Sequence, residues 1–209
     1  MKLTIIGDGS FGTFLKSLLK DTFELQTWNV DPTADSVVLA VPISAYDGLA
    51  AQLDDKHLIN VCSVQKPSTD ILLKHTDRVT SIHPLFGKRT PADRRNSILT
   101  RSYTECNDTW LSEDRTESVF LSLFSSVSTI HSNDWLGITF TPESHDALMA
   151  KTHVAAVMAA KQLKVYTDRV SQIPDCFMPN SFRMMKEFVK TLDDMPKGTI
   201  ESIMANPYF

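Results

Sequence analysis

Short, largely apolar runs alternate with amphipathic segments over the first two thirds of the chain. Seven of the runs are predicted to be strands: Lys2–Ile6, Phe23–Trp28, Ser36–Val41, Leu58–Cys62, Val79–Ile82, Ser97–Arg101 and Val127–His131. The segments between them are predicted to be helices: Thr13–Lys20, Ser44–Leu53, Thr69–His75 and Glu113–Phe124. This alternation predicts an α/β fold with a doubly wound, mostly parallel sheet of the Rossmann type.

The pattern changes after residue 140, where the remaining sequence is compatible with helices only. Thr141 can cap a helix that begins at Pro142, and helical periodicity then continues to about Val170. After two prolines, a second helix is predicted at Ser181–Leu192, followed by a short tail. The sequence therefore predicts two domains, at residues 1–140 and 141–209.

Composition narrows the class of protein. The net charge of −4 and the lack of a dense basic run argue against a nucleic-acid partner. The three cysteines have no C-x-x-C spacing, which argues against a disulfide framework or a zinc site and favours the reducing cytoplasm. No apolar stretch approaches the roughly 20 residues that span a bilayer, and no signal peptide precedes the first strand. We expect a cytoplasmic protein without a membrane partner.

A glycine-rich segment connects the first predicted strand to the first helix. Gly7, Gly9 and Gly12 match the pattern G-x-G-x-x-G. In a dinucleotide-binding turn, the first glycine permits the tight turn, the second lets the backbone approach a pyrophosphate, and the third allows helix and strand to pack closely. The helix N-terminus, at Ser10 and Phe11, would offer amide groups to the phosphates. The alternative is a glycine-rich turn that binds no ligand.

The choice between NAD and NADP stays open. Dinucleotide-binding domains usually carry an acidic residue at the end of the second strand, which binds the adenosine ribose. That position falls at about Asn29, with Asp31 two residues later and no arginine beside it. Asn29 is thus a candidate cofactor contact that favours neither form.

Four further segments resemble the prephenate/arogenate dehydrogenase family of tyrosine biosynthesis. They occur in the family's order and cover most of the chain. The segments are Asp35–Ile43 with its Val-Pro pair, Asn60–Gln65 (similar to D-x-x-S-V-K), His83–Gly87 (similar to H-P-M-F-G) and Glu143–Asp146 (similar to E-x-H-D).

This resemblance implies an NAD(P)-dependent enzyme that oxidatively decarboxylates prephenate or arogenate. Hydride passes from the ring carbon bearing the hydroxyl group to the nicotinamide, carbon dioxide leaves and the ring becomes aromatic. By resemblance, His83 would bond the ring hydroxyl and help to remove its proton, and Ser63 would hold the histidine or the hydroxyl in position. Val41 and Pro42 would line the cofactor site. The helical domain would bind substrate and form a homodimer.

The position of His83 in the sequence also makes it a candidate catalytic residue, although less specifically than the resemblance does. It follows an apolar strand, at the edge where open α/β sheets place their ligands. Ser63 follows the preceding strand, so both side chains could face one crevice. The alternatives are a loop histidine that bonds a backbone carbonyl group, and a serine that only caps a turn or helix.

The long helix and the segment after it carry the candidate substrate contacts. His145 and His153 lie on one broad helical face, and His153 falls close to a substrate-contacting position of the family. His145 could equally be a structural residue of the first turn. Their spacing differs from the i, i+4 spacing of a two-histidine metal pair, so no metal is predicted. Arg183 is the candidate anchor for the ring carboxylate, although the family's arginine falls nearer Lys190.

Two departures from the family pattern keep other functions open. Gln65 replaces the usual lysine, and the helical region is shorter than is typical. These differences allow a reductase of another small acid or imine on the same scaffold. They also allow a non-catalytic protein that senses a dinucleotide.

Overall fold

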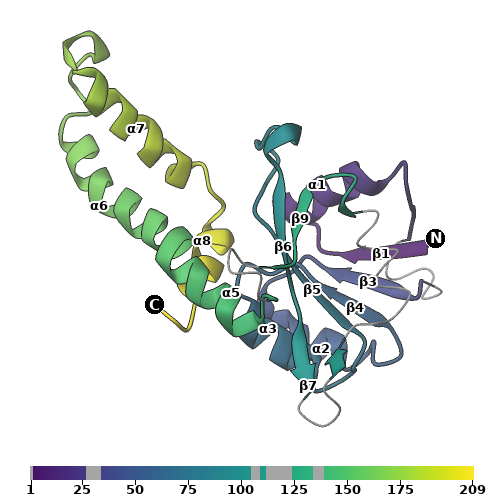
Figure 1. Cartoon of the computed structure of the whole chain (residues 1–209). Coiled ribbons are helices and arrows are strands. Elements are labelled where there is room, and N and C mark those ends of the chain that lie inside the picture. Colours follow the sequence, from purple (N-terminus) through teal and green to yellow (C-terminus); the bar gives the residue numbers. More distant parts are fainter. Residues whose placement is uncertain (1, 27–33, 105–108, 112–123, 134–138) are drawn as a thin grey trace. The chain divides into compact units, whose positions relative to one another are not determined.

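The computed structural model describes residues 2–26, 34–104, 109–111, 124–133 and 139–209. Its contacts divide the chain into two compact units, Met1–Asp146 and Ala147–Phe209 (Figure 1). The first unit contains the strands, and the second consists of helices.

A mixed sheet forms the centre of the first unit. Within the described residues it has seven strands in the order β2-β1-β3-β4-β5-β6-β9 (Figure 1). β1 to β5 run parallel, β6 is antiparallel to β5, and β9 is parallel to β6. The strand bounds are β1 Lys2–Ile6, β2 Glu24–Gln26, β3 Ser36–Leu39, β4 His57–Asn60, β5 Val79–Pro84, β6 Asn96–Thr100 and β9 Thr129–His131. The predicted doubly wound, mostly parallel α/β fold is confirmed.

The remaining elements of this unit are short. A separate antiparallel pair is formed by β7 (Ser102–Thr104) and β8 (Thr109–Leu111). Two 3₁₀ turns lie at Ile43–Ala45 and Ala92–Arg94. Most of the helix predicted at Glu113–Phe124 lies outside the described residues, as does the end of the predicted strand Phe23–Trp28.

Helices cover both faces of the sheet, and β3 shows why its sequence is apolar without interruption. Val38 faces a cluster that includes Leu15 and Leu19 of helix α1 (Ser10–Leu19). Val37 and Leu39 face the other cluster, which includes residues of α2 (Tyr46–Ala50) and α3 (Gln65–Leu72). Successive side chains of a strand point to opposite faces, so both faces need apolar residues. Each such burial contributes about 1.5–3 kcal/mol.

The second unit continues from a helix that begins in the first. α5 (Pro142–Met149) runs into a π-helical segment, Ala150–Val154, and then into α6 (Ala155–Arg169). A 3₁₀ turn (Asp175–Phe177), α7 (Asn180–Asp193) and α8 (Lys197–Met204) follow. A small core holds this unit together, consisting of Val154, Val157, Ala160, Leu192 and Ile203.

Two features of the second unit differ from the sequence prediction. The tail after the second predicted helix forms α8, which begins directly after Pro196 and buries Ile203. The π-helical segment replaces i→i+4 bonding with i→i+5 bonding. His153 lies inside this segment, whereas the face that it was predicted to share with His145 assumed a uniform 100° per residue.

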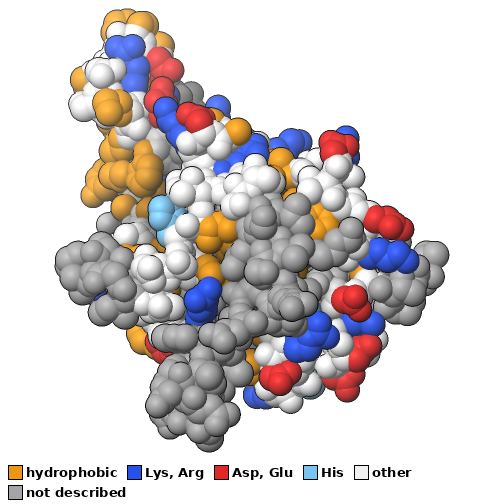
Figure 2. All heavy atoms as spheres, turned by 45° about the vertical axis from the view of Figure 1, so that its right-hand side comes forward, with side chains coloured by type: hydrophobic (Ala, Val, Ile, Leu, Met, Phe, Trp, Pro, Cys, Tyr) orange, Lys and Arg blue, Asp and Glu red, His pale blue; other side chains and the backbone are white. Residues whose placement is uncertain are grey.

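Several large apolar side chains of the second unit are exposed to solvent. Figure 2 shows hydrophobic side chains gathered over this helical unit. They include Val165, Tyr166, Ile173, Phe177, Met184 and Phe188. Exposed apolar groups in such number are typical of surfaces that contact another protein.

Candidate active site

Packing within the glycine turn after β1 requires a glycine at two positions. Gly7 has φ of +126°, a conformation that residues with a side chain rarely adopt. A Cβ atom at Gly7 would overlap the carbonyl oxygen of Ala40, and one at Gly12 would overlap the carbonyl oxygen of Gly7. These two glycines are therefore needed to bring the turn, the end of β3 and α1 together.

Gly9 differs, because nothing inside the protein requires a glycine there. A Cβ atom at this position would meet no atom within 4 Å. Gly9 is the N-cap of α1, and its carbonyl accepts the first helical bond from Thr13 N at 3.0 Å. The amides that precede Thr13 in this helix have no intrahelical acceptor, and the first turn carries no acidic residue. This exposed helix N-terminus suits an anionic ligand that approaches the backbone closely.

The topology places this turn at the switch point of the sheet. β1 lies between β2 and β3, and the helices that follow β1 and β3 lie on opposite faces. Ligands of open α/β sheets bind where the connections diverge in this way. Ala40 N donates to Ile6 O at 2.8 Å, so the segment leading to Val41 and Pro42 lies beside the turn. Asn29, the other predicted cofactor contact, lies outside the described residues.

His83 lies at the carboxyl end of β5, on the same edge of the sheet. Its backbone pairs with Ile98 of β6, and its side chain is 2% exposed. Ile82 belongs to the core cluster that includes α1 residues. The strand alternation therefore directs His83 to the other face, where α3 lies.

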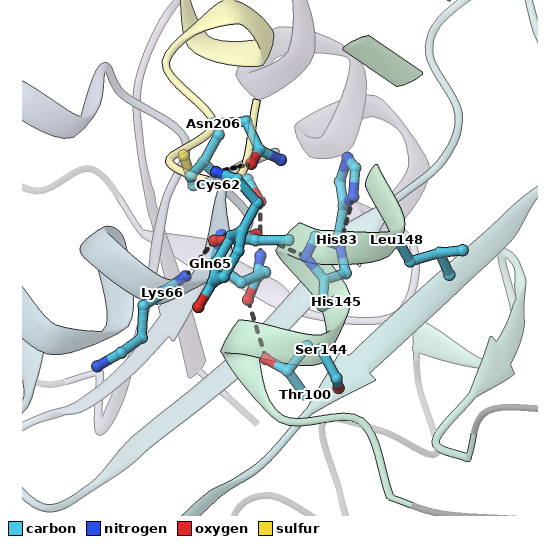
Figure 3. Close-up of polar contacts among 12 residues, drawn as sticks. Cys62, Gln65, Lys66, His83, Thr100, Ser144, His145, Leu148 and Asn206 are labelled. Atoms are coloured by element: carbon cyan, nitrogen blue, oxygen red, sulfur yellow. Dashed lines mark hydrogen bonds and ion pairs between the residues drawn. The ribbon is translucent and has the colours of Figure 1, made fainter. Parts of the chain in front are cut away.

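The imidazole of His83 forms a hydrogen bond with a second histidine (Figure 3). His83 Nδ1 lies 2.9 Å from His145 Nε2, and the two rings meet edge to face. His145 Nδ1 in turn lies 2.8 Å from Asp146 Oδ1. The side chains of His145 and Asp146 are fully buried. Asp146, His145 and His83 thus form a continuous chain of hydrogen bonds.

Asp146 also caps helix α3. Its Oδ1 accepts from Gln65 N and its Oδ2 from Lys66 N, each at 2.8 Å. These are the first amides of α3, and the N-cap residue Val64 supplies no side-chain bond. A carboxylate at a helix N-terminus is stabilised by the amides and by the helix dipole. The start of α3 is thus defined by a residue about eighty positions later in the sequence.

Gln65 is a structural residue of the site. It is fully buried, its side-chain amide donates to Cys62 O at 2.5 Å, and its carbonyl accepts from the Thr100 hydroxyl at 3.1 Å. The position that resembles the family's lysine therefore joins the segment after β4 to β6. Sequence reasoning identified the substitution but not this role.

A buried polar network supports the segment after β4. Asn60 Oδ1 accepts from Cys62 N at 2.9 Å, and its amide donates to the Ser68 hydroxyl at 2.8 Å. The Tyr46 hydroxyl lies 3.0 Å from both Asn60 Oδ1 and Leu39 O. Burial raises the pKa of Tyr46 well above its ordinary value. Sequence reasoning did not identify this network, because its members are ordinary polar residues on separate elements.

One cation stands at the margin of the site. Lys66 Nζ lies 2.6 Å from Asp70 Oδ1 and 3.3 Å from Glu143 Oε1. The hydrogen bond to Asp70 raises the pKa of Lys66, and Glu143 adds to the effect. Lys66 therefore stays charged at neutral pH and joins α3 to the start of α5.

The other predicted contacts are distributed over both units. Ser63 is half-buried between β4 and α3, and Nδ1 of His83 is bonded by His145 rather than by Ser63. In the second unit, His153 is half-buried within the π-helical segment. Arg183 is exposed on α7, and its Nε donates to Met178 O at 3.2 Å.

The described part of the chain contains neither a cluster of metal-binding side chains nor a membrane-spanning helix. No group of three or more histidine, cysteine or acidic side chains in the described ranges is placed to hold a metal ion. Among the helices described, none combines the length and apolarity needed to cross a membrane.

Comparison with known proteins gives matches in structure only. The sequence matches no family model and no curated protein. A prephenate dehydrogenase from A. aeolicus, in complex with hydroxyphenyl propionate and NAD+, aligns over 99% of this chain and 82% of its own with a TM-score of 0.64 and 15% identity. A putative prephenate dehydrogenase from Corynebacterium glutamicum aligns over 97% and 74% with a TM-score of 0.70 and 16% identity. Synechocystis arogenate dehydrogenase aligns over 99% and 86% with a TM-score of 0.60 and 14% identity. The chain has the same fold as these dehydrogenases.

Proposed function

We propose that the protein is an NAD(P)-dependent dehydrogenase that oxidatively decarboxylates prephenate or arogenate. The observation that carries this proposal is that the glycine turn and His83 lie at the same edge of the sheet. The glycine turn follows β1, and His83 is the penultimate residue of β5, three strands away in the order β1-β3-β4-β5. That separation is roughly 14 Å at about 4.8 Å per strand. An extended dinucleotide can reach from the turn to the imidazole over such a distance.

The residues of the turn fit the cofactor. The amides at Ser10 and Phe11 would hold its pyrophosphate, Gly9 leaves room for close approach, and Val41 and Pro42 follow the neighbouring strand. When bound, NAD+ or NADP+ supplies the acceptor for the hydride of the substrate. No residue on the described part of β2 favours one cofactor over the other.

His83 is proposed to act on the ring hydroxyl. The imidazole accepts the hydroxyl proton as hydride leaves the same carbon, and returns it to the phenolic oxygen once the ring is aromatic. The carboxyl group of the ring leaves as carbon dioxide, so the reaction releases no net proton. General-base assistance of this kind contributes about 10²- to 10⁴-fold to a rate. Ser63 is proposed to position the hydroxyl.

The second unit is proposed to bind substrate and to form a homodimer. His153 and Arg183 are its candidate contacts, with Arg183 offered for a carboxylate because a guanidinium binds such groups in a bidentate manner. The exposed apolar side chains of α6 and α7 support the dimer. We propose a cytoplasmic location from the cysteine content.

The proposal is tested by assaying reduced nicotinamide formation. Purified protein is mixed with prephenate or arogenate, each with NAD+ and with NADP+, and the decarboxylated product is identified by mass spectrometry. We expect turnover with at least one of the four pairs. Protein that binds a cofactor in calorimetry and turns over neither substrate would overturn the proposal.

A second candidate is a reductase of another small acid or imine. One observation favours it, namely that Gln65 stands where the family has a lysine and has both ends of its amide bonded inside the protein. A panel of keto acids and cyclic imines, assayed with reduced cofactor, separates this candidate from the first.

A further inference from the structure

We propose that His145 and Asp146 are positioning residues that fix the tautomer of His83. Under this proposal the neutral imidazole of His83 carries its proton on Nδ1 and its lone pair on Nε2. The catalytic meaning of the inference depends on the proposed role of His83 as a base. The arrangement of protons is a separate property that can be measured without substrate.

The carboxylate oxygens of Asp146 face three N–H positions. The amides of Gln65 and Lys66 can only donate, so the carboxylate accepts from both. The carboxylate also lies 2.8 Å from Nδ1 of His145 and must accept there as well. His145 therefore carries a proton on Nδ1.

The proton on Nδ1 of His145 determines the tautomer of His83. A neutral His145 with its proton on Nδ1 has a lone pair on Nε2. Nε2 lies 2.9 Å from His83 Nδ1, so the proton between the two rings belongs to His83 Nδ1. Neutral His83 then has its lone pair on Nε2, as a base that accepts the substrate proton requires.

The bond between the rings also limits the charge of the pair. Only one proton fits between two nitrogens 2.9 Å apart, so the two histidines cannot both be imidazolium ions. When His83 takes a proton on Nε2, the positive charge lies next to a ring that is bonded to a carboxylate. The Ser-His-Asp arrangement of serine proteases uses a carboxylate in the same way, to orient an imidazole and to stabilise its charged form.

The relay is held rigidly by the fold. His145 and Asp146 are fully buried, and α3 fixes the carboxylate through its first two amides. The carboxylate cannot rotate away without exposing buried donors, which costs about 1–3 kcal/mol for each. The relay therefore connects the end of β5, the start of α3 and the start of α5 as one rigid group.

The first experiment measures the tautomer in protein without substrate. ¹⁵N-labelled histidine NMR distinguishes a protonated ring nitrogen from one with a lone pair, and the His83→Asn spectrum assigns the His83 signals among the six histidines. We expect a protonated Nδ1 and an unprotonated Nε2 at His83. A neutral His83 ring with its proton on Nε2 and its lone pair on Nδ1 in the wild type would overturn the relay.

The second experiment removes the relay. In His145→Phe, His83 loses its acceptor and is expected to change to the Nε2-protonated tautomer that free histidine favours. In Asp146→Asn, the side-chain amide can donate to His145 Nδ1 and thereby invert both tautomers. We expect kcat to fall by about 10²- to 10⁴-fold in each variant, with KM little changed, as for a comparable carboxylate-to-amide change in a protease triad.

A matched control is provided by another buried histidine. His57 bonds Ser36 and Thr80 at the opposite end of the sheet. His57→Gln is expected to lower stability but to leave the His83 tautomer and kcat as in the wild type.

If His145→Phe changes neither the tautomer nor kcat, the relay is wrong. Wild-type protein with the expected tautomer but no turnover would support the relay and overturn only the proposed dehydrogenase. Turnover together with an Nε2-protonated His83 would overturn only the relay.

Discussion

Gly9 and Gly12 belong to the same turn but are glycines for different reasons. A side chain at Gly12 would overlap the backbone of the turn itself, whereas one at Gly9 would meet no atom of the protein. Gly9 is also the N-cap of α1, so the open space beside it adjoins the amides to which an anionic ligand would bind.

This difference predicts opposite effects of one substitution at the two positions. Gly9→Ala should leave stability nearly unchanged but weaken NAD(P) binding by at least about tenfold, about 1.4 kcal/mol of binding free energy. Gly12→Ala should destabilise the first unit by about 1–3 kcal/mol, the usual cost of overpacking. Urea denaturation and calorimetry measure the two quantities. Gly9→Ala protein that binds cofactor as tightly as the wild type would contradict the role of Gly9.

His83 is predicted to contribute to kcat but not to cofactor binding. His83→Asn should lower kcat by about 10²- to 10⁴-fold, because a general base is lost. Cofactor affinity should stay close to that of the wild type, since the glycine turn is unchanged. Steady-state kinetics and calorimetry on one preparation provide both readings. Equal losses of cofactor affinity and of kcat would indicate a structural role instead.

The buried hydroxyl of Tyr46 is predicted to make the stability of the protein depend on pH. Its folded pKa is raised by burial, so its hydroxyl contributes stability fully below the unfolded pKa of about 10 and loses that contribution as pH rises above it. Tyr46→Phe should cost about 1 kcal/mol at neutral pH through the lost hydrogen bond to Asn60 or Leu39. Above about pH 10, the wild type should lose up to about 1.4 kcal/mol per pH unit more than the variant. Urea denaturation of both proteins at neutral pH and at about pH 11 measures the difference; parallel pH curves would contradict it.

At the scale of elements, the hydrophobic pattern predicted the helices and strands whose positions depend on residues nearby in the sequence. Both faces of β1, β3, β4 and β5 are covered, so short buried runs marked these strands in the sequence, and α1 follows its glycine turn directly. The start of α3 was predicted four residues late, because its cap is Asp146 and no local signal marks Gln65 as the first residue. The π-helical segment likewise has no signature in the hydrophobic period.

The cap of α3 gives a prediction for this scale. Asp146→Ala leaves the amides of Gln65 and Lys66 without their acceptor and leaves His145 without its partner. The unfolding free energy should fall by about 3–5 kcal/mol, as when one partner of a buried network is removed. Hydrogen exchange should speed up first at the amides at the start of α3. Protection that stays unchanged there, in a folded variant, would show that the cap does not stabilise the helix.

At the scale of the whole molecule, sequence reasoning located the parts of the site but not their connections. The motifs identified His83 and His145 separately, and their separation of 62 positions in the sequence hides the bond that joins their rings. Such contacts depend on how β5, α3 and α5 meet, which follows from the fold rather than from spacing. The buried roles of Gln65 and Asn60 were missed for the same reason.

The central claim is that one edge of the sheet brings a bound nicotinamide to the imidazole of His83. A crystal structure of the protein with NAD+ and hydroxyphenyl propionate tests it most directly. We predict that the pyrophosphate lies on the amides of Ser10 and Phe11, and that the nicotinamide ring and the phenol oxygen both lie beside His83. A cofactor bound away from the glycine turn, or a nicotinamide ring out of reach of His83, would contradict the account.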